Sequence, residues 1–403
     1  MKLLMTADTL GGVWTYCMEL CAALAPYEVT ISLATMGRHL SPEQRWQVKR
    51  LPHVQVHEST YRLCWMQDAW DDVEQAGKWL LSLEEEIKPD IVHLNDLAHG
   101  GLKWHTPVVL VAHSCVFSWW DAVHGTTPPL DKWGRYHETV SCSVRNANLV
   151  LAPSHAMLKA LLRFYGAART CSVVYNGRDF PPLEKSRSAL GGIPFQRRNL
   201  TVNPENSDDN TSDVSPNEPT EPFIFAAGRI WDEAKNVGVL SPIVDKLPWP
   251  VYAAGEQTDP NGDSNIPEGL NCLGFLNSDE MAQWLRRAGI YVAPAHYEPF
   301  GLSILEAARA GCALVLGDIE SLREVWDDAA VYVDPDDPEQ MRLVLSDLAE
   351  NSSKRRELAE RAWQRAKRYT ASRMAASYMQ WYRYTIKDAV EKQTGKPMSG
   401  AHA

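Results

Sequence analysis

Several features that would place a protein in a familiar class are absent from this sequence of 403 residues. No apolar run approaches the ~18 residues that cross a bilayer, so we expect no transmembrane segment. Residues 1–8 have too short an apolar part, and turn acidic too soon, for a secretory signal peptide. We interpret this stretch as a first core strand.

An excess of basic residues is also absent. The sequence contains 40 lysine and arginine residues against 51 aspartate and glutamate residues, which gives a net charge of −11. A protein whose main partner is nucleic acid usually carries the opposite balance. We therefore expect no nucleic-acid partner.

Cysteine pairs of the C-x-x-C type are missing as well, and the spacing of His93, His99 and His105 fits no zinc pattern. The cysteines are scattered through apolar stretches, so we predict buried, reduced thiols in a cytoplasmic protein. The eight positions are Cys17, Cys21, Cys64, Cys115, Cys142, Cys171, Cys272 and Cys312.

The sequence instead shows a regular alternation of short β-rich apolar runs and amphipathic stretches, which is typical of parallel α/β layering. In the first half the expected strands are 2–6, 29–34, 54–57, 91–94, 108–112, 149–152 and 173–175. In the second half they are 223–227, 251–254, 270–273, 290–293, 313–316 and 330–333. This pattern predicts two α/β domains.

A polar segment separates the two halves. Residues 196–222 are rich in Asn, Ser, Asp, Pro and Thr and bury too little apolar surface to offset their ordering entropy, so we expect a flexible linker or disordered insertion. The predicted parts are an N-terminal domain, a linker, a C-terminal domain, and a final helix with a tail: 1–190, 191–222, 223–370 and 371–403. One side of that helix carries large apolar residues that need a surface to pack against: Met374, Tyr378, Trp381 and Tyr382.

Two short motifs follow expected strands and can contact an anion. Gly11 and Gly12 open a helix, where the backbone can approach a phosphate or a sugar; a plain tight turn is the alternative. The pair is not the G-x-G-x-x-G dinucleotide fingerprint. Arg229 and Lys235 lie six residues apart and could converge on a diphosphate, or remain two solvated charges.

The run 296–307 is the most specific motif. Phe300, Gly301 and Leu302 would present backbone amides at a helix N-terminus, which can hold a phosphate or a sugar oxygen. Glu298 precedes this helix and Glu306 lies on its second turn, where each carboxylate can accept hydrogen bonds from sugar hydroxyls. The alternatives are a helix cap for Glu298 and an exposed helix residue for Glu306.

Taken together, these motifs resemble those of family-4 glycosyltransferases. The E-x7-E spacing of Glu298 and Glu306 is similar to the donor-site signature of that family, and Arg229 with Lys235 resembles its diphosphate-binding pair. Further matching segments occur in the order that the family shows: 11–12, 152–154, 175–179 and 322–325.

The resemblance implies the GT-B fold, in which two Rossmann-like domains face each other across a cleft and the final helix crosses back to the N-terminal domain. It implies a retaining hexosyl transfer from a nucleotide-diphosphate sugar, with no cofactor and no metal. UDP-hexose is the first expectation for this donor and GDP-mannose the second. The acceptor hydroxyl, on a sugar or another small molecule, is unidentified.

The resemblance also assigns roles in the N-terminal domain. His113 corresponds to a histidine near the donor sugar, with a purely structural histidine as the alternative. Trp119 and Trp120 lie on an expected loop where acceptor pockets occur, and Asn176 belongs to a matching motif; core packing explains the tryptophans equally well. The residues 334–336 spell D-x-D, but we interpret Asp336 or Asp337 as a helix cap and predict no metal site.

Two alternative functions remain open. A GT-B epimerase or phosphorylase would share the fold, although we find no motif for a pyridoxal-phosphate lysine. A nucleotide-sugar-binding protein without turnover would share the donor site.

Over residues 1–185 acidic and basic residues are nearly equal in number. This balance favours a soluble acceptor over an anionic lipid and leaves peripheral membrane contact open.

Overall fold

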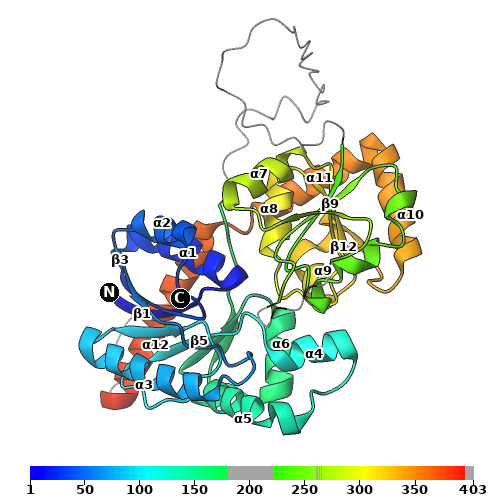
Figure 1. The fold of residues 1–403 in the computed structure, drawn as a ribbon. Coiled ribbons are helices and arrows are strands. Elements are labelled where there is room, and N and C mark those ends of the chain that lie inside the picture. The colour runs from blue at the N-terminus through cyan, green and yellow to red at the C-terminus, as the bar shows by residue number, and fades with distance from the viewer. Residues whose placement is uncertain (180–221, 260–261, 263, 265, 395–403) are drawn as a thin grey trace, which may run out of the picture.

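The computed structural model describes residues 1–179, 222–259, 262, 264 and 266–394. Most of the predicted linker 191–222 and the tail after 394 lie outside these residues. The described chain forms two α/β domains, each built on a parallel sheet (Figure 1).

The first sheet has seven strands, and every pairing in it is parallel. Its order is β3 (Val54–Glu58), β2 (Thr30–Met36), β1 (Lys2–Asp8), β4 (Ile91–Leu94), β5 (Val108–Val111), β6 (Leu149–Ala152) and β7 (Cys171–Val173). The central strands are buried along their whole length because helices cover both faces, which explains their continuous apolar sequences.

The second sheet has six strands, again all parallel. Its order is β10 (Asn271–Gly274), β9 (Val251–Ala254), β8 (Ile224–Ala227), β11 (Ile290–Ala293), β12 (Ala313–Gly317) and β13 (Val331–Val333). In both sheets the strand order reverses once, between β1 and β4 and between β8 and β11. Ligands of open α/β sheets bind beside such a reversal, at the carboxyl ends of the strands.

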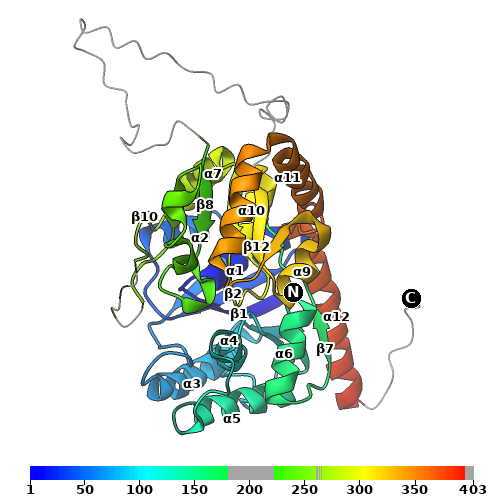
Figure 2. The same ribbon diagram turned by 90° about the vertical axis from the view of Figure 1, so that its right-hand side faces the viewer.

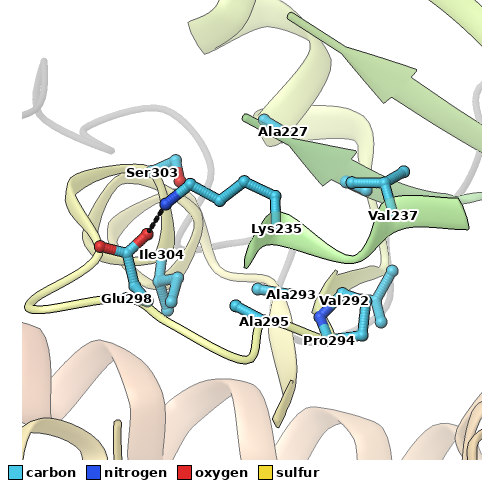
Figure 3. A pocket seen from close by; sticks show the side chains of 11 residues that line it. Ala227, Lys235, Val237, Val292, Ala293, Pro294, Ala295, Glu298, Ser303 and Ile304 are labelled. Atoms are coloured by element: carbon cyan, nitrogen blue, oxygen red, sulfur yellow. Dashed lines mark hydrogen bonds and ion pairs between the residues drawn. The ribbon is translucent and has the colours of Figure 1, made fainter. Parts of the chain in front are cut away.

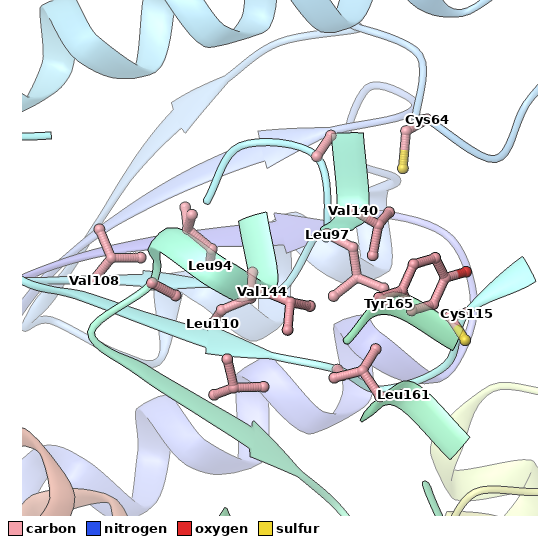
Figure 4. Packing of buried hydrophobic residues seen from close by; sticks show 14 of the residues in the cluster. Cys64, Leu94, Leu97, Val108, Leu110, Cys115, Val140, Val144, Leu161 and Tyr165 are labelled. Carbon is pink, nitrogen blue, oxygen red and sulfur yellow. The ribbon is translucent and has the colours of Figure 1, made fainter. Parts of the chain in front are cut away.

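Two hydrophobic clusters sandwich the first sheet. One lies beneath α3 (Trp70–Ile87), α5 (Leu130–Asn146) and α6 (His155–Tyr165), where Leu110, Val144 and Leu161 pack together (Figure 4). The other lies beneath α1 (Gly12–Leu24) and the C-terminal helix α12 (Ala371–Thr394). The short helix α2 (Pro42–Lys49) has no buried residue and begins with a capping box at Ser41.

The second sheet is covered by its own helices. Cluster residues on one face come from α7 (Ser278–Arg287), α8 (Leu302–Ala310), α9 (Glu320–Trp326) and α11 (Ser352–Ala366). The other face packs against α10 (Pro338–Glu350) and the 3₁₀ turn Val237–Leu240.

Helix α12 leaves the second domain and packs against the first (Figures 1 and 2). Met374, Tyr378 and Tyr382 are buried against α1 and the first sheet, whereas Trp381 is only partly covered. The predicted return of the final helix is therefore confirmed, and its aromatic side completes the core of the first domain.

Two local expectations need correction. Trp119 and Trp120 lie on a helix, α4 (Val116–His124), rather than on a loop, because residues 116–124 contain no glycine or proline before Gly125 ends the helix. All eight cysteines are free thiols, but Cys142 and Cys171 are exposed and Cys272 is half-buried. No helix within the described ranges is long and apolar enough to cross a membrane.

Candidate functional site

The two sheets bring their strand-order reversals to the space between the domains. Arg229 follows β8, and Glu298 follows β11, which is the neighbouring strand at the reversal. In the first domain the corresponding positions carry Asp8, the last residue of β1, and Asn95, directly after β4. The topology alone thus places charged and polar residues from distant parts of the sequence at one location.

Lys235 and Glu298, which both line a small pocket, form an ion pair (Figure 3). The Nζ atom of Lys235 lies 2.6 Å from Oε2 of Glu298, and the two side chains are 20% and 16% exposed. Lys235 ends the 3₁₀ turn Glu233–Lys235 rather than lying on a longer helix. An incoming diphosphate can replace this carboxylate as the partner of the lysine, because both are oxygen anions.

Arg229 contacts the buried carboxylate of Asp232 at 2.5 Å. Burial alone would raise the pKa of Asp232, but the charges of Arg229 and Lys235 hold it below its ordinary value. The indole N–H of Trp119, from the other domain, also donates to Asp232 at 2.9 Å. Asp232 was not predicted from the sequence, and it orients Arg229 while it joins the two domains.

The N-terminus of α8 has the backbone shape expected for an anion-binding turn. Gly301 has φ 87°, and a β-carbon there would approach the Ile304 side chain to 2.6 Å, so the position requires glycine. The ring of Phe300 is buried in the core, so Phe300 can reach a ligand only through its backbone. Leu302 is the first residue of the helix, where the amides point away from the helix and the dipole favours an anion.

Glu306 is buried rather than exposed, which removes the simplest alternative for it. Its carboxylate forms an ion pair with Arg178, and Nε of Arg178 lies 3.2 Å from Oε1 of Glu19. Glu19 and Arg178 belong to the first domain. The predicted ribose contact therefore starts from a carboxylate that is already engaged across the domain boundary.

His113 lies two residues beyond β5 and lines a second pocket, in the first domain. Its Nε2 atom is 2.8 Å from Oδ1 of Asn95. Burial, with a smaller effect from His93, lowers the pKa of His113 to about 3, so the ring is neutral at physiological pH. Gly12 begins helix α1 after Gly11, which has φ 73°, at the same end of the sheet.

Asp8 lines the pocket of His113 and was missed in the sequence. One carboxylate oxygen accepts from the backbone N–H of Leu10 at 2.6 Å. Burial raises the pKa of Asp8 to about 7, against the lowering effect of that hydrogen bond and of Arg229 and Arg38. The signal available in the sequence was an aspartate at the end of the first buried strand, beside the strand-order reversal.

The three residues expected on the acceptor side do not form one group. Trp119 and Trp120 contact each other edge to face with ring centroids 6.4 Å apart, and both are half-buried. Asn176 is buried near the start of α12, where the neighbouring Gly177 amide donates to Met374 Sδ. Of the three, Trp119 contacts Asp232 across the domain boundary, whereas the indole N–H of Trp120 donates to Thr126 in its own domain.

The domains are joined by several further hydrogen bonds. The carboxylate of Glu324 accepts from the first two amides of α6 at 2.7 and 2.9 Å and from the Tyr175 hydroxyl at 2.9 Å. The Ser154 hydroxyl donates to the carbonyl of Pro299 at 2.7 Å. A carboxylate from one domain thus caps a helix of the other, which favours a defined relative position.

Asp337 is the N-cap of α10 and accepts from the Gln340 amide at 2.9 Å, as the helix-cap interpretation predicted. Within the part of the chain that the structure covers, no three His, Cys, Asp or Glu side chains are grouped so that they could hold a metal ion.

Two family profiles match the chain in sequence. "Glycosyltransferase Family 4" matches residues 10–180, and "Glycosyl transferases group 1" matches residues 209–365. Among curated relatives, the phosphatidyl-myo-inositol mannosyltransferase of Mycolicibacterium smegmatis is 34% identical over 117 residues, which are 28% of this chain and 30% of that protein. The chain spans less than a third of the length of the first curated relatives that it matches.

Solved structures resemble the whole described fold. The sucrose-phosphate synthase of Thermosynechococcus elongatus has a TM-score of 0.74 at 16% identity and covers 95% of this chain and 98% of its own. The Anabaena protein HepE, solved with UDP and glucose, has a TM-score of 0.66 at 16% identity and covers 95% and 100%. These similarities confirm the predicted two-domain GT-B architecture.

Proposed function

From the premise that this chain is a glycosyltransferase of the family-4 type with the GT-B fold, we propose its reaction in more detail. The chain transfers a hexosyl group from a nucleotide-diphosphate sugar to an acceptor hydroxyl, with retention of configuration and without a metal ion. The observation that carries the proposal is the convergence of Lys235, Arg229 and the α8 N-terminus beside Glu298.

These groups suit the departure of a diphosphate. As the bond between the anomeric carbon and the diphosphate oxygen breaks, negative charge develops on the leaving group, and Lys235 and Arg229 stabilise it. Glu298, released from Lys235, stabilises the positive charge that develops on the sugar. A diphosphate oxygen accepts the proton of the acceptor hydroxyl, which attacks from the same face and forms the new glycosidic bond.

The donor preference is UDP-hexose first and GDP-mannose second. HepE, which shares the fold, was solved with UDP and glucose, and this supports the first choice. Mannosyltransferases among the curated relatives support the second. Glu306 is proposed to bind the ribose hydroxyls once Arg178 moves away, because a carboxylate can accept both vicinal hydrogen bonds.

A two-part experiment tests this proposal. Melting temperatures are measured with UDP-glucose, GDP-mannose and ADP-glucose; a ligand at 100 times its dissociation constant stabilises by about 2.7 kcal/mol. Release of the nucleoside diphosphate is then followed with a panel of sugar acceptors, and NMR identifies the anomer of the product. Stabilisation without release supports a binding protein, and conversion of the sugar within the intact nucleotide supports an epimerase; an inverted product contradicts retention.

A further inference from the structure

A chain of buried polar side chains connects helix α12 to the pocket of His113. Tyr382 OH lies 2.5 Å from Nδ1 of His93, and Nε2 of His93 lies 3.0 Å from Oδ1 of Asn95. The same oxygen lies 2.8 Å from Nε2 of His113. His93 and Tyr382 are fully buried and Asn95 is nearly so, whereas His113 lines the pocket.

The orientation of the Asn95 amide determines every proton in this chain. Its Nδ2 donates to the carbonyl oxygen of Thr6 at 2.7 Å, and a carbonyl can only accept, so the amide cannot be flipped. Oδ1 must therefore accept from both imidazoles, which is possible because an amide oxygen has two lone pairs.

Both histidines consequently carry their proton on Nε2. His93 then accepts the hydroxyl proton of Tyr382 at Nδ1, and burial, which lowers the pKa of His93 to about 3, keeps this ring neutral. The hydroxyl oxygen of Tyr16, 3.4 Å from Nε2 of His93, can share the same proton. For His113 the result is an unprotonated Nδ1, which has no hydrogen-bond partner among the residues that the structure describes.

We propose that Asn95, His93 and Tyr382 are positioning residues that hold His113 in its Nε2-protonated tautomer, so that Nδ1 accepts a hydrogen bond from a substrate hydroxyl. The substrate part rests on the proposed function, whereas the tautomer does not. A histidine with the opposite tautomer would present an N–H to the pocket and would select an acceptor atom instead of a hydroxyl proton.

NMR of protein labelled with ¹⁵N-histidine tests the tautomer without turnover. The signals of His113 are assigned by their loss in His113→Gln. We expect Nε2 of His113 to be protonated and Nδ1 to be unprotonated in the ligand-free protein. A protonated Nδ1 would overturn the proposal, and this result is readable even if no nucleotide sugar is turned over.

Asn95→Asp tests the positioning role through a pH profile. The new carboxylate beside Nε2 raises the pKa of His113, so that the ring becomes a cation that cannot accept at Nδ1. We expect kcat for nucleotide release to fall about tenfold at pH 6 and to recover as the pH rises, with little change in the donor KM. A loss that is equal at every pH would indicate a merely structural role and contradict the proposal. The other titratable groups that contact His113 or share its pocket are Asp8, Tyr16, Cys64, His93, Asp96 and Tyr136. The new carboxylate also faces Nε2 of His93 and raises the pKa of that ring, so the NMR signals of both rings are followed with pH.

Tyr382→Phe keeps the shape of the core and supplies a second test if Asn95→Asp fails to fold. Without the hydroxyl donor, Nδ1 of His93 loses its hydrogen bond, and we expect its ¹⁵N signal to move towards that of a free unprotonated nitrogen, while Nε2, which faces Oδ1 of Asn95, stays protonated. Tyr378→Phe is the matched control, because Tyr378 stacks on His93 from the same helix but makes no hydrogen bond to it among the described contacts. An unchanged ¹⁵N signal of His93 Nδ1 in Tyr382→Phe, or equal changes in both variants, would remove Tyr382 from the chain.

Discussion

The two pockets of this protein differ in how they hold their polar groups. Around Lys235 and Glu298 the groups are ions that neutralise each other in pairs, so a charged ligand must replace one partner. Around His113 burial keeps the imidazoles neutral, and hydrogen bonds fix their orientation. Exchange of ion partners suits a leaving group whose charge grows, whereas a fixed neutral network suits recognition of hydroxyl groups.

The strongest test of this difference between the pockets removes the positive charge of Lys235 on the donor side. Lys235→Ala leaves the diphosphate without a charge-assisted contact, and we expect the transfer rate at limiting donor to fall by about 100-fold or more. Lys246→Ala, an exposed lysine of the same domain, is the control and should have no effect. Initial rates of nucleotide release measure both, and an unchanged rate in Lys235→Ala would exclude this residue from the site.

Variants of Glu298 and Glu306 test the separate roles assigned to these two residues in the donor site. Glu298→Gln should lower kcat about tenfold more than it raises the donor KM, because its charge matters most in the transition state. Glu306→Gln should chiefly raise the donor KM by weakening the ribose contacts. Donor titrations at saturating acceptor separate the two, and identical kinetic profiles would contradict the assigned roles.

Two carboxyl groups, Asp8 and Asp96, also line the His113 pocket, and the titration of Asp8 should appear in stability. Its folded pKa of about 7 lies above the ordinary value of 3.8, so its stabilising contribution is complete below about pH 4 and is lost as the pH rises through 7. A shift of this size corresponds to at most about 4 kcal/mol. Asp8→Asn should therefore gain stability relative to the wild type at pH 8 but not at pH 4.

Melting temperatures at the two pH values measure this effect. Asp71→Asn, at an exposed aspartate in the first turn of α3, is the control. A wild-type difference between pH 4 and pH 8 that persists in Asp8→Asn would assign the effect to other groups.

The smallest expected effect concerns metal ions. If Arg229, Lys235 and the α8 amides neutralise the leaving group, excess EDTA should change activity by no more than about a factor of two. Assays with and without EDTA, each followed by added manganese, measure this. Complete loss that manganese restores would show that residues 334–337 were misinterpreted.

Much of the architecture was predictable because strands buried on both faces have continuous apolar sequences. The β1–β2 and β8–β11 regions were located to within two or three residues for this reason. Charged residues directly after such strands, such as Arg229, were predictable as well. Their partners were not: Asp232 meets Trp119 only because the domains come together, and no local pattern encodes this distance.

The histidine network shows a second kind of limit. His93 was considered only as a zinc ligand and Asn95 was not considered, although both lie at the end of a buried strand beside a strand-order reversal. Polar residues at the end of a buried strand could have indicated a ligand site from the sequence. The link to Tyr382 was not accessible from the sequence, because 289 positions separate the two partners.

The crossing of α12 has a consequence for the order in which the protein is made. The strands of the first sheet are synthesised early, yet the part of one face that α1 leaves uncovered stays exposed until Tyr378 and Tyr382 have been synthesised. The first domain therefore cannot complete its folding before the second domain has been translated, in contrast to chains whose domains fold in sequence order. Until then the nascent chain exposes an apolar surface of the kind that chaperones bind.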